Sequence, residues 1–192
     1  IPESVTTIEK EAFEYCTSLT SVNIPDSVTT IGEYAFSRCS SLKSVNIPDS
    51  VTTIGKGTFS YCKSLTSVTI GDSVTTIGND AFYDCESLKS VNIPESVTTI
   101  GEGAFEDCYN LKEFTGKYAA DGGRCLIIDN TIIAYAEASG TTYNIPDSVT
   151  TIGNYAFERC DSLTSVNIPD SVTTIGDYAF YSCTSLTSVN IP

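Results

Sequence analysis

Residues 24–46 read IPDSVTTIGEYAFSRCSSLKSVN, and residues 47–69 repeat nearly the same 23 letters. The unit also begins at residues 1, 70, 93, 145 and 168, and one longer unit, residues 116–144, interrupts the series. A fixed period in the twenties is typical of a solenoid, in which each coil packs only on its neighbours. The sequence therefore predicts one solenoid domain over residues 1–192. Its coils are 1–23, 24–46, 47–69, 70–92, 93–115, the variant coil 116–144, 145–167 and 168–190.

Three local patterns make up each regular coil. Residues 42–47, LKSVNI, follow the LxxLxL pattern of a strand whose apolar residues point inward and whose polar residues point outward. Residues 51–54, VTTI, are β-branched and favour a second short strand. In residues 33–39, EYAFSRC, the apolar positions have helical spacing, which predicts a short helix held by packing.

The combined pattern, IPxSVTxIGxxAFxxCxxLxSVxIP, resembles the BspA-type leucine-rich repeats of bacterial surface proteins over nearly the whole chain. The AFxxC and IP elements distinguish it from other leucine-rich repeats. Two departures are small: Glu9 stands where other coils have Gly, and Thr58 stands where others have Ala before the Phe. The resemblance implies an α/β solenoid, a right-handed superhelix with short strands and a short helix per coil.

The variant coil 116–144 lacks the AFxxC element. Residues 125–135 instead form two apolar, β-rich runs around Asp129-Asn130, which predicts a hairpin. The repeat resumes with Tyr143 in the position that Val45 holds in its own coil. We interpret the segment as a hairpin-bearing coil within the domain. It is either a recognition feature or a tolerated insertion.

Two columns of repeated residues have the chemistry of possible sites. Because ladder cysteines point the same way from successive coils, we expect free thiols that fill the core and neither disulfides nor zinc ligands. An acidic residue follows each Ile-Pro or Ile-Gly pair, where turn chemistry is expected in preference to a metal site. The cysteines are Cys16, Cys39, Cys62, Cys85, Cys108, Cys160 and Cys183, with Cys125 apart; the acidic residues are Glu3, Asp26, Asp49, Asp72, Glu95, Asp147 and Asp170.

The outward positions of the first strand are the candidate partner-binding surface, because leucine-rich repeats commonly bind through this side. An alternative is that these small polar side chains only form hydrogen-bonded ladders between coils. The candidate residues are Ser44, Asn46, Ser67, Thr69, Ser90, Asn92, Glu113, Thr115, Ser165 and Asn167.

Composition restricts the function. Ten basic against 24 acidic residues give a formal charge of −14, which disfavours nucleic acid and anionic membranes as partners. No apolar run reaches the ~18 residues that direct membrane insertion needs. The chain has no histidine for a Ser-His or Cys-His nucleophile and no glycine-rich phosphate loop, so we expect neither an enzyme nor a cofactor.

The family resemblance implies an extracellular adhesion module at the bacterial surface, with a protein or glycan of the host matrix or of neighbouring cells as partner. The alternative is a structural spacer that projects another domain, which the near-identity of the coils favours. The pattern starts and stops within the repeat, so we expect a piece of a longer protein whose signal and anchor lie elsewhere.

Overall fold

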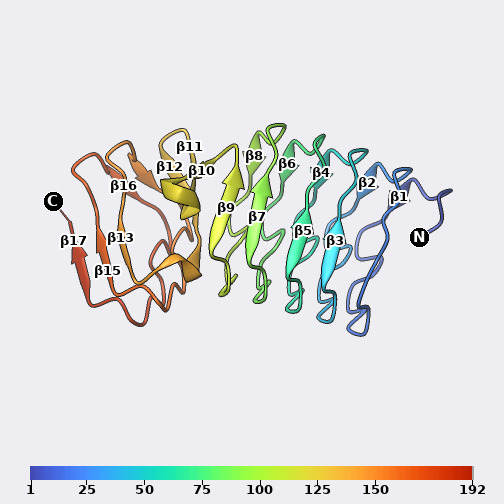
Figure 1. Ribbon diagram of the computed structural model, residues 1–192, viewed down its shortest axis with the longest axis horizontal. Helices are drawn as coiled ribbons and strands as arrows, with labels where there is room; N and C mark the ends of the chain where they lie inside the picture. Colours follow the sequence, from blue (N-terminus) through green and yellow to red (C-terminus); the bar gives the residue numbers. More distant parts are fainter. Residues whose placement is uncertain (192) are drawn as a thin grey trace.

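The structure, a computed structural model, describes residues 1–191. Successive coils stack along one axis, with the N-terminus at one end of the stack and the C-terminus at the other (Figure 1). Equivalent short strands of neighbouring coils pair in parallel, because each turn of the chain returns it one step along the stack. This is a β-solenoid of 23-residue coils, as the repeat predicts.

The first strand of each coil has the expected orientation. In Ser44–Asn46 (β3), Val45 is buried while both polar neighbours are exposed, and Ser44 pairs with Ser67 of the next coil. These strands form three short sheets, β3-β5, β7-β9 and β13-β15-β17. The other members are Ser67–Thr69 (β5), Ser90–Ile93 (β7), Glu113–Gly116 (β9), Thr142–Asn144 (β13), Ser165–Asn167 (β15) and Ser188–Asn190 (β17). Their outward side chains form what we call the strand face.

The second strand of each coil has only two residues, a Thr and an inward Ile. Five of them form one sheet and two more join the hairpin of the variant coil in another. The strands are Thr7–Ile8 (β1), Thr30–Ile31 (β2), Thr53–Ile54 (β4), Thr76–Ile77 (β6), Thr99–Ile100 (β8), Thr151–Ile152 (β14) and Thr174–Ile175 (β16).

The expected short helix per coil is wrong. In the segment 33–39, Tyr34 and Arg38 have left-handed φ values of 55° and 62°, which a right-handed helix does not accommodate. The Ala35 N–H bonds within its coil to Gly32 O at 3.2 Å, whereas the Tyr34 N–H bonds to Lys56 O of the next coil at 2.9 Å. The segment is therefore a series of tight turns that also pairs with its neighbours, and we call it the turn segment.

Helical structure among residues 1–191 is limited to two 3-10 turns in the variant coil, Asp121–Gly123 (η1) and Glu137–Ser139 (η2). Neither of them has the length and apolar character that a membrane-crossing helix needs.

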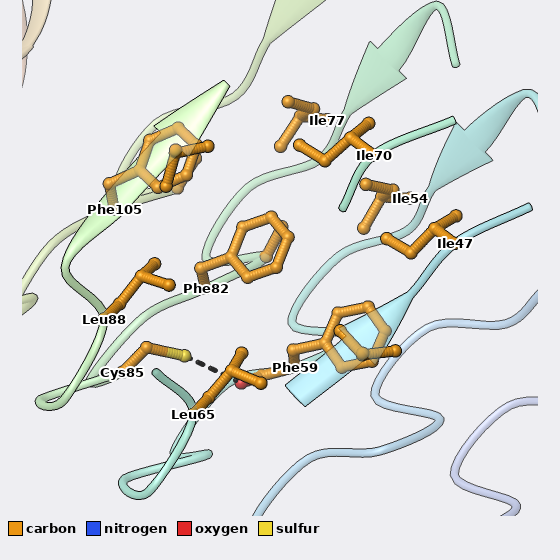
Figure 2. Close-up of a cluster of buried hydrophobic side chains, with 14 of the residues drawn as sticks. Ile47, Ile54, Phe59, Leu65, Ile70, Ile77, Phe82, Cys85, Leu88 and Phe105 are labelled. Carbon is orange, nitrogen blue, oxygen red and sulfur yellow. Dashed lines mark hydrogen bonds between the residues drawn. The ribbon is translucent and has the colours of Figure 1, made fainter. Parts of the chain in front are cut away.

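Phenylalanine rings stack through the core (Figure 2). The Phe36 and Phe59 ring centroids are 5.5 Å apart and those of Phe59 and Phe82 are 5.6 Å apart, with nearly parallel planes. Such offset stacking adds about 0.5–1.5 kcal/mol per pair to the burial term. The Cys85 thiol donates a hydrogen bond to Phe59 O at 3.3 Å, which Figure 2 shows as a dashed line.

All eight cysteines are free thiols in the structure. Six of them are buried, Cys183 is partly buried and Cys16 is exposed in the first coil. Burial raises the pKa of the Cys39 thiol to about 11. The buried thiols therefore stay protonated at neutral pH, and their role in the core is packing together with a weak bond to the preceding coil.

The predicted hairpin is confirmed. Cys125–Ile128 (β11) and Thr131–Tyr135 (β12) pair antiparallel, and Asp129 and Asn130 between them have φ values of 48° and 61°. Two successive positive φ values are typical of a tight hairpin turn. The start of β12 pairs in parallel with β14, so it replaces the missing second strand, and Ala119–Ala120 (β10) extends the hairpin on the other side. Tyr143 pairs with Val166 and is buried, which confirms its predicted position.

Candidate interaction surfaces

The strand face presents the predicted residues together on one side of the solenoid. Nine of the ten candidates are exposed and Ser165 is half-buried. Hydrogen bonds join neighbouring coils at some of them: the Thr115 hydroxyl lies 3.1 Å from Asn92 Oδ1, and Asn190 Nδ2 donates to Asn167 Oδ1 at 2.8 Å. The ladder interpretation therefore has support at the Asn and Thr residues that end these strands, and the role of the candidates in partner binding stays a prediction.

The acidic column lies exposed at the turns after the Ile-Pro pairs. One of its carboxylates, Asp49 Oδ1, accepts the backbone N–H of Asp72 in the next coil at 2.7 Å. This bond agrees with turn chemistry at that pair. Within residues 1–191, no group of three or more His, Cys, Asp or Glu side chains is arranged to hold a metal ion.

A second exposed surface is formed by the side chains of the turn segments, and we call it the turn face. The Arg38 guanidinium carbon lies 4.1 Å from the ring centroid of Tyr61 and 5.2 Å from that of Tyr15, so a cation is held between two rings from neighbouring coils. The Tyr61 ring meets the Tyr83 ring edge-on at 5.1 Å. Tyrosine and arginine are the residues that dominate binding energy at protein interfaces, and the strand face lacks them.

A groove of about 510 Å³ runs along the turn face. Its lining comes from five coils, and Tyr61, Asp80, Glu106 and Tyr155 are among the contributors. Sequence reasoning did not select it, because these side chains project from turns that the sequence predicted to be helical. Variation offered a signal: position 11 of the coil holds Tyr34, Gly57, Asp80, Gly103 and Tyr155, while the strand face hardly varies.

The variant coil leaves a discontinuity on the turn side that we call the seam. Because residues 116–144 lack a turn segment, the coils 93–115 and 145–167 meet directly through side chains. Arg159 Nη1 lies 2.9 Å from Asp107 Oδ2, and Asn154 Nδ2 donates to Glu102 Oε1 at 3.0 Å. A small pocket of about 20 Å³, room for about one water molecule, lies between the two turn segments and the variant coil.

Carboxyl groups crowd the seam. Burial and the neighbouring Glu158 carboxylate raise the pKa of Glu106, and burial together with the Asp107 carboxylate raises the pKa of Glu158. Burial, opposed by the Asp161 backbone N–H, raises the pKa of Glu137 to about 7. The Asp107 carboxylate, only 2% exposed, raises the pKa of Arg159. The raised pKa values and the Arg159–Asp107 ion pair both lessen the repulsion between acidic coils at the seam.

Short parallel strands from successive 23-residue coils, wound around columns of Ile, Leu, Val and Phe, define a leucine-rich repeat solenoid. The family model for the BspA type leucine rich repeat region matches residues 1–115 and 130–192, with six copies. The chain therefore belongs to the BspA-type leucine-rich repeat family. Repeats of this family generally act as non-catalytic scaffolds. A comparison with curated proteins found no match.

Three solved structures with the same fold come from bacteria. A leucine-rich cell-surface protein from Faecalibacterium prausnitzii is 35% identical, with a TM-score of 0.81, over 100% of this chain and 59% of that one. A leucine-rich repeat protein from Bacteroides ovatus is 31% identical, with a TM-score of 0.63, over 96% of this chain and 58% of that one. The pneumococcal vaccine antigen PcpA, 20% identical over 100% of this chain and 50% of that one, shares the fold with a TM-score of 0.79. The chain thus spans about half to three fifths of these structures.

Proposed function

We propose that this chain is a non-catalytic binding module of a bacterial cell-surface protein, which attaches to a protein or glycan of a host matrix or of neighbouring cells. The observation that carries the proposal is the strand face, where chemically equivalent polar side chains recur at each regular coil. Such a surface offers the same weak contact many times, and repeated contacts on one rigid support add up to avidity. The whole of this chain matches part of the cell-surface protein from F. prausnitzii, and this similarity supports an extracellular location.

A structural spacer is the second candidate. The Asn167–Asn190 and Asn92–Thr115 bonds favour it, because side chains that bond to the next coil are less free to bond to a partner. In the central coils, however, Ser44, Ser67 and Ser90 are exposed. The two candidates therefore differ in what these serines do.

Charged variants of the strand face separate the candidates. The purified chain is immobilised, and binding of matrix proteins and of a glycan panel is measured by surface plasmon resonance. Ser67→Glu combined with Ser90→Glu introduces two charges into adjacent strands of the strand face. Thr30→Glu combined with Thr53→Glu introduces the same charges into adjacent strands on another side, at residues that are also exposed.

A binding module gives saturable binding that the serine variant abolishes and the threonine variant keeps. Binding that both variants reduce equally would reflect net charge and not the strand face. No saturable binding to any member of the panel would refute the adhesion proposal and leave the spacer.

A further inference from the structure

Two glycines give the turn-face groove its shape. Gly57 and Gly103 have left-handed φ values of 58° and 63° and hold the coil position that Tyr34 and Asp80 hold in the preceding coils. A Cβ atom on Gly57 would collide with the Tyr34 ring, and one on Gly103 would lie 2.8 Å from Asp80 Oδ1. The ring and the carboxylate therefore lean over the following coil, into space that a larger residue would fill.

The aromatic part of the lining already contacts cations from the chain itself. Arg38 lies over Tyr61, at one edge of the groove, as described above. Lys56 Nζ lies 3.8 Å from Asp80 Oδ2. A guanidinium thus lies over a ring of this lining, and an ammonium group pairs with one of its carboxylates. These two contacts indicate that the groove suits cationic groups.

The groove also carries more negative than positive charge. The carboxylates of Asp80 and Glu102 line it, and Lys56 balances the first of them at its edge. The formal charge of −14 on the whole chain adds long-range attraction for a cationic partner. A volume of about 510 Å³ is within the range of sites that enclose small ligands, and it accommodates a long basic side chain with its aliphatic stem.

We propose that this groove binds arginine or lysine side chains presented by an exposed basic segment of a partner protein. The proposal rests on the proposed function, since it assumes a binding module, but it assigns recognition to a different surface from the strand face. A guanidinium inserted here stacks on tyrosine rings while its N–H groups bond to Asp80 and Glu102. Tyrosine rings also stack on sugars, so a neutral glycan is the alternative that the experiment must separate.

The test is isothermal titration calorimetry of the folded chain with three probes. The first is a short Gly-Ser peptide with two arginines, the second is the same peptide with citrulline in place of arginine, and the third is a neutral oligosaccharide. We expect saturable binding of the arginine peptide alone. Asp80→Asn combined with Glu102→Gln should weaken it about five- to thirtyfold, and Tyr34→Leu about two- to tenfold.

Matched variants keep the test specific. Asp26→Asn combined with Glu95→Gln removes the same charge from the exposed acidic column, and Tyr181→Leu removes an exposed tyrosine that neither lines the groove nor stacks on a tyrosine that does. These variants should bind the arginine peptide as the parent does. Far-ultraviolet circular dichroism verifies that each variant is folded.

Three outcomes would overturn the proposal: equal weakening in the Asp26 and Asp80 double variants, equal binding of the citrulline peptide, or binding of the oligosaccharide in place of the arginine peptide. The Ser67→Glu and Ser90→Glu variant should still bind the arginine peptide. Peptide binding without any attachment to matrix proteins would refute the adhesion proposal alone, and attachment without peptide binding would refute this one alone.

Discussion

Replacing Glu158 by Gln is expected to make the protein less sensitive to pH. In the parent chain, burial and the Glu158 carboxylate across the seam raise the pKa of Glu106, and the carboxylates of Asp107 and Asp80 add to this shift. Burial and Asp107 raise the pKa of Glu158, which Arg159 opposes. Glutamine is of the same size, cannot ionise, and can donate a hydrogen bond to the Glu106 carboxylate. The variant therefore keeps the contact and removes the repulsion.

The sign follows from proton binding. Glutamate in the unfolded chain ionises near pH 4.5, whereas burial raises the pKa of Glu106, Glu158 and Glu137 in the folded chain, for Glu137 to about 7. Between these values the folded state binds more protons, so the free energy of unfolding falls as pH rises from about 4.5 through neutrality. Each pKa unit corresponds to about 1.4 kcal/mol. The pKa of Glu106 is raised to about 8, but solvent screens the half-buried pair, so we expect Glu106 and Glu158 together to contribute only about 1–2 kcal/mol.

Urea unfolding at pH 5, 7 and 9, followed by circular dichroism, measures the effect. We expect the parent to lose about 1–2 kcal/mol between pH 5 and 9 beyond the shares of Glu137 and of the buried thiols, whose raised pKa values lower stability toward pH 9 equally in both proteins, and the Glu158→Gln variant to lose less. The two proteins should be nearly equal at pH 5, with the variant the more stable at pH 9. Glu95→Gln, an exposed carboxyl in the acidic column, is the control and should keep the parent slope. A parent stability that does not fall with pH, or a variant with the parent slope, would refute this account of the seam.

Three further predictions concern packing. Phe82→Ala should cost about 3–5 kcal/mol of unfolding free energy, because its ring is fully buried and stacked on both sides, and a urea-measured loss below about 1 kcal/mol would contradict the column. Thiol titration should find Cys16 reactive in the folded protein and all eight thiols only in denaturant, so a lower final count would exclude the free-thiol ladder. Gly57→Ala should lower the melting temperature more than Gly122→Ala, since both strain a left-handed backbone but only the former collides with Tyr34; equal shifts would show that the ring moves aside at no cost.

The period and the strands were predictable because burial repeats with the sequence. Val45, Val91 and Val166 are buried at the same coil position, which fixes the register of the parallel first strands. The hairpin was predictable for a related reason: Asp129-Asn130 is a dipeptide that tolerates two positive φ values. In each case a local preference and the requirement for burial point to the same structure.

The helix prediction failed because spacing alone does not report backbone handedness. Ala35, Phe36 and Cys39 share the inner side of the coil in either a helix or a series of turns. What separates the two is the left-handed residue at Tyr34 and its equivalents, where Gly57, Gly103 and Asp80 give the sequence a detectable preference for positive φ. Read as a column, those residues indicate a turn, although each one alone fits an exposed helical position.

The same backbone geometry explains why the turn face varies more than the strand face. A side chain on the strand face lies between identical neighbours and can bond to them, as Asn167 does with Asn190, so a change there alters the contact with the next coil. A left-handed residue at the tip of a turn, such as Tyr34, Asp80 or Tyr155, projects outward from the stack and can differ from coil to coil. A surface of identical contacts strengthens attachment without selecting a partner, whereas an ordered series of tyrosines and acids can select one. We therefore expect the avidity of this module to reside on the strand face and its specificity on the turn face.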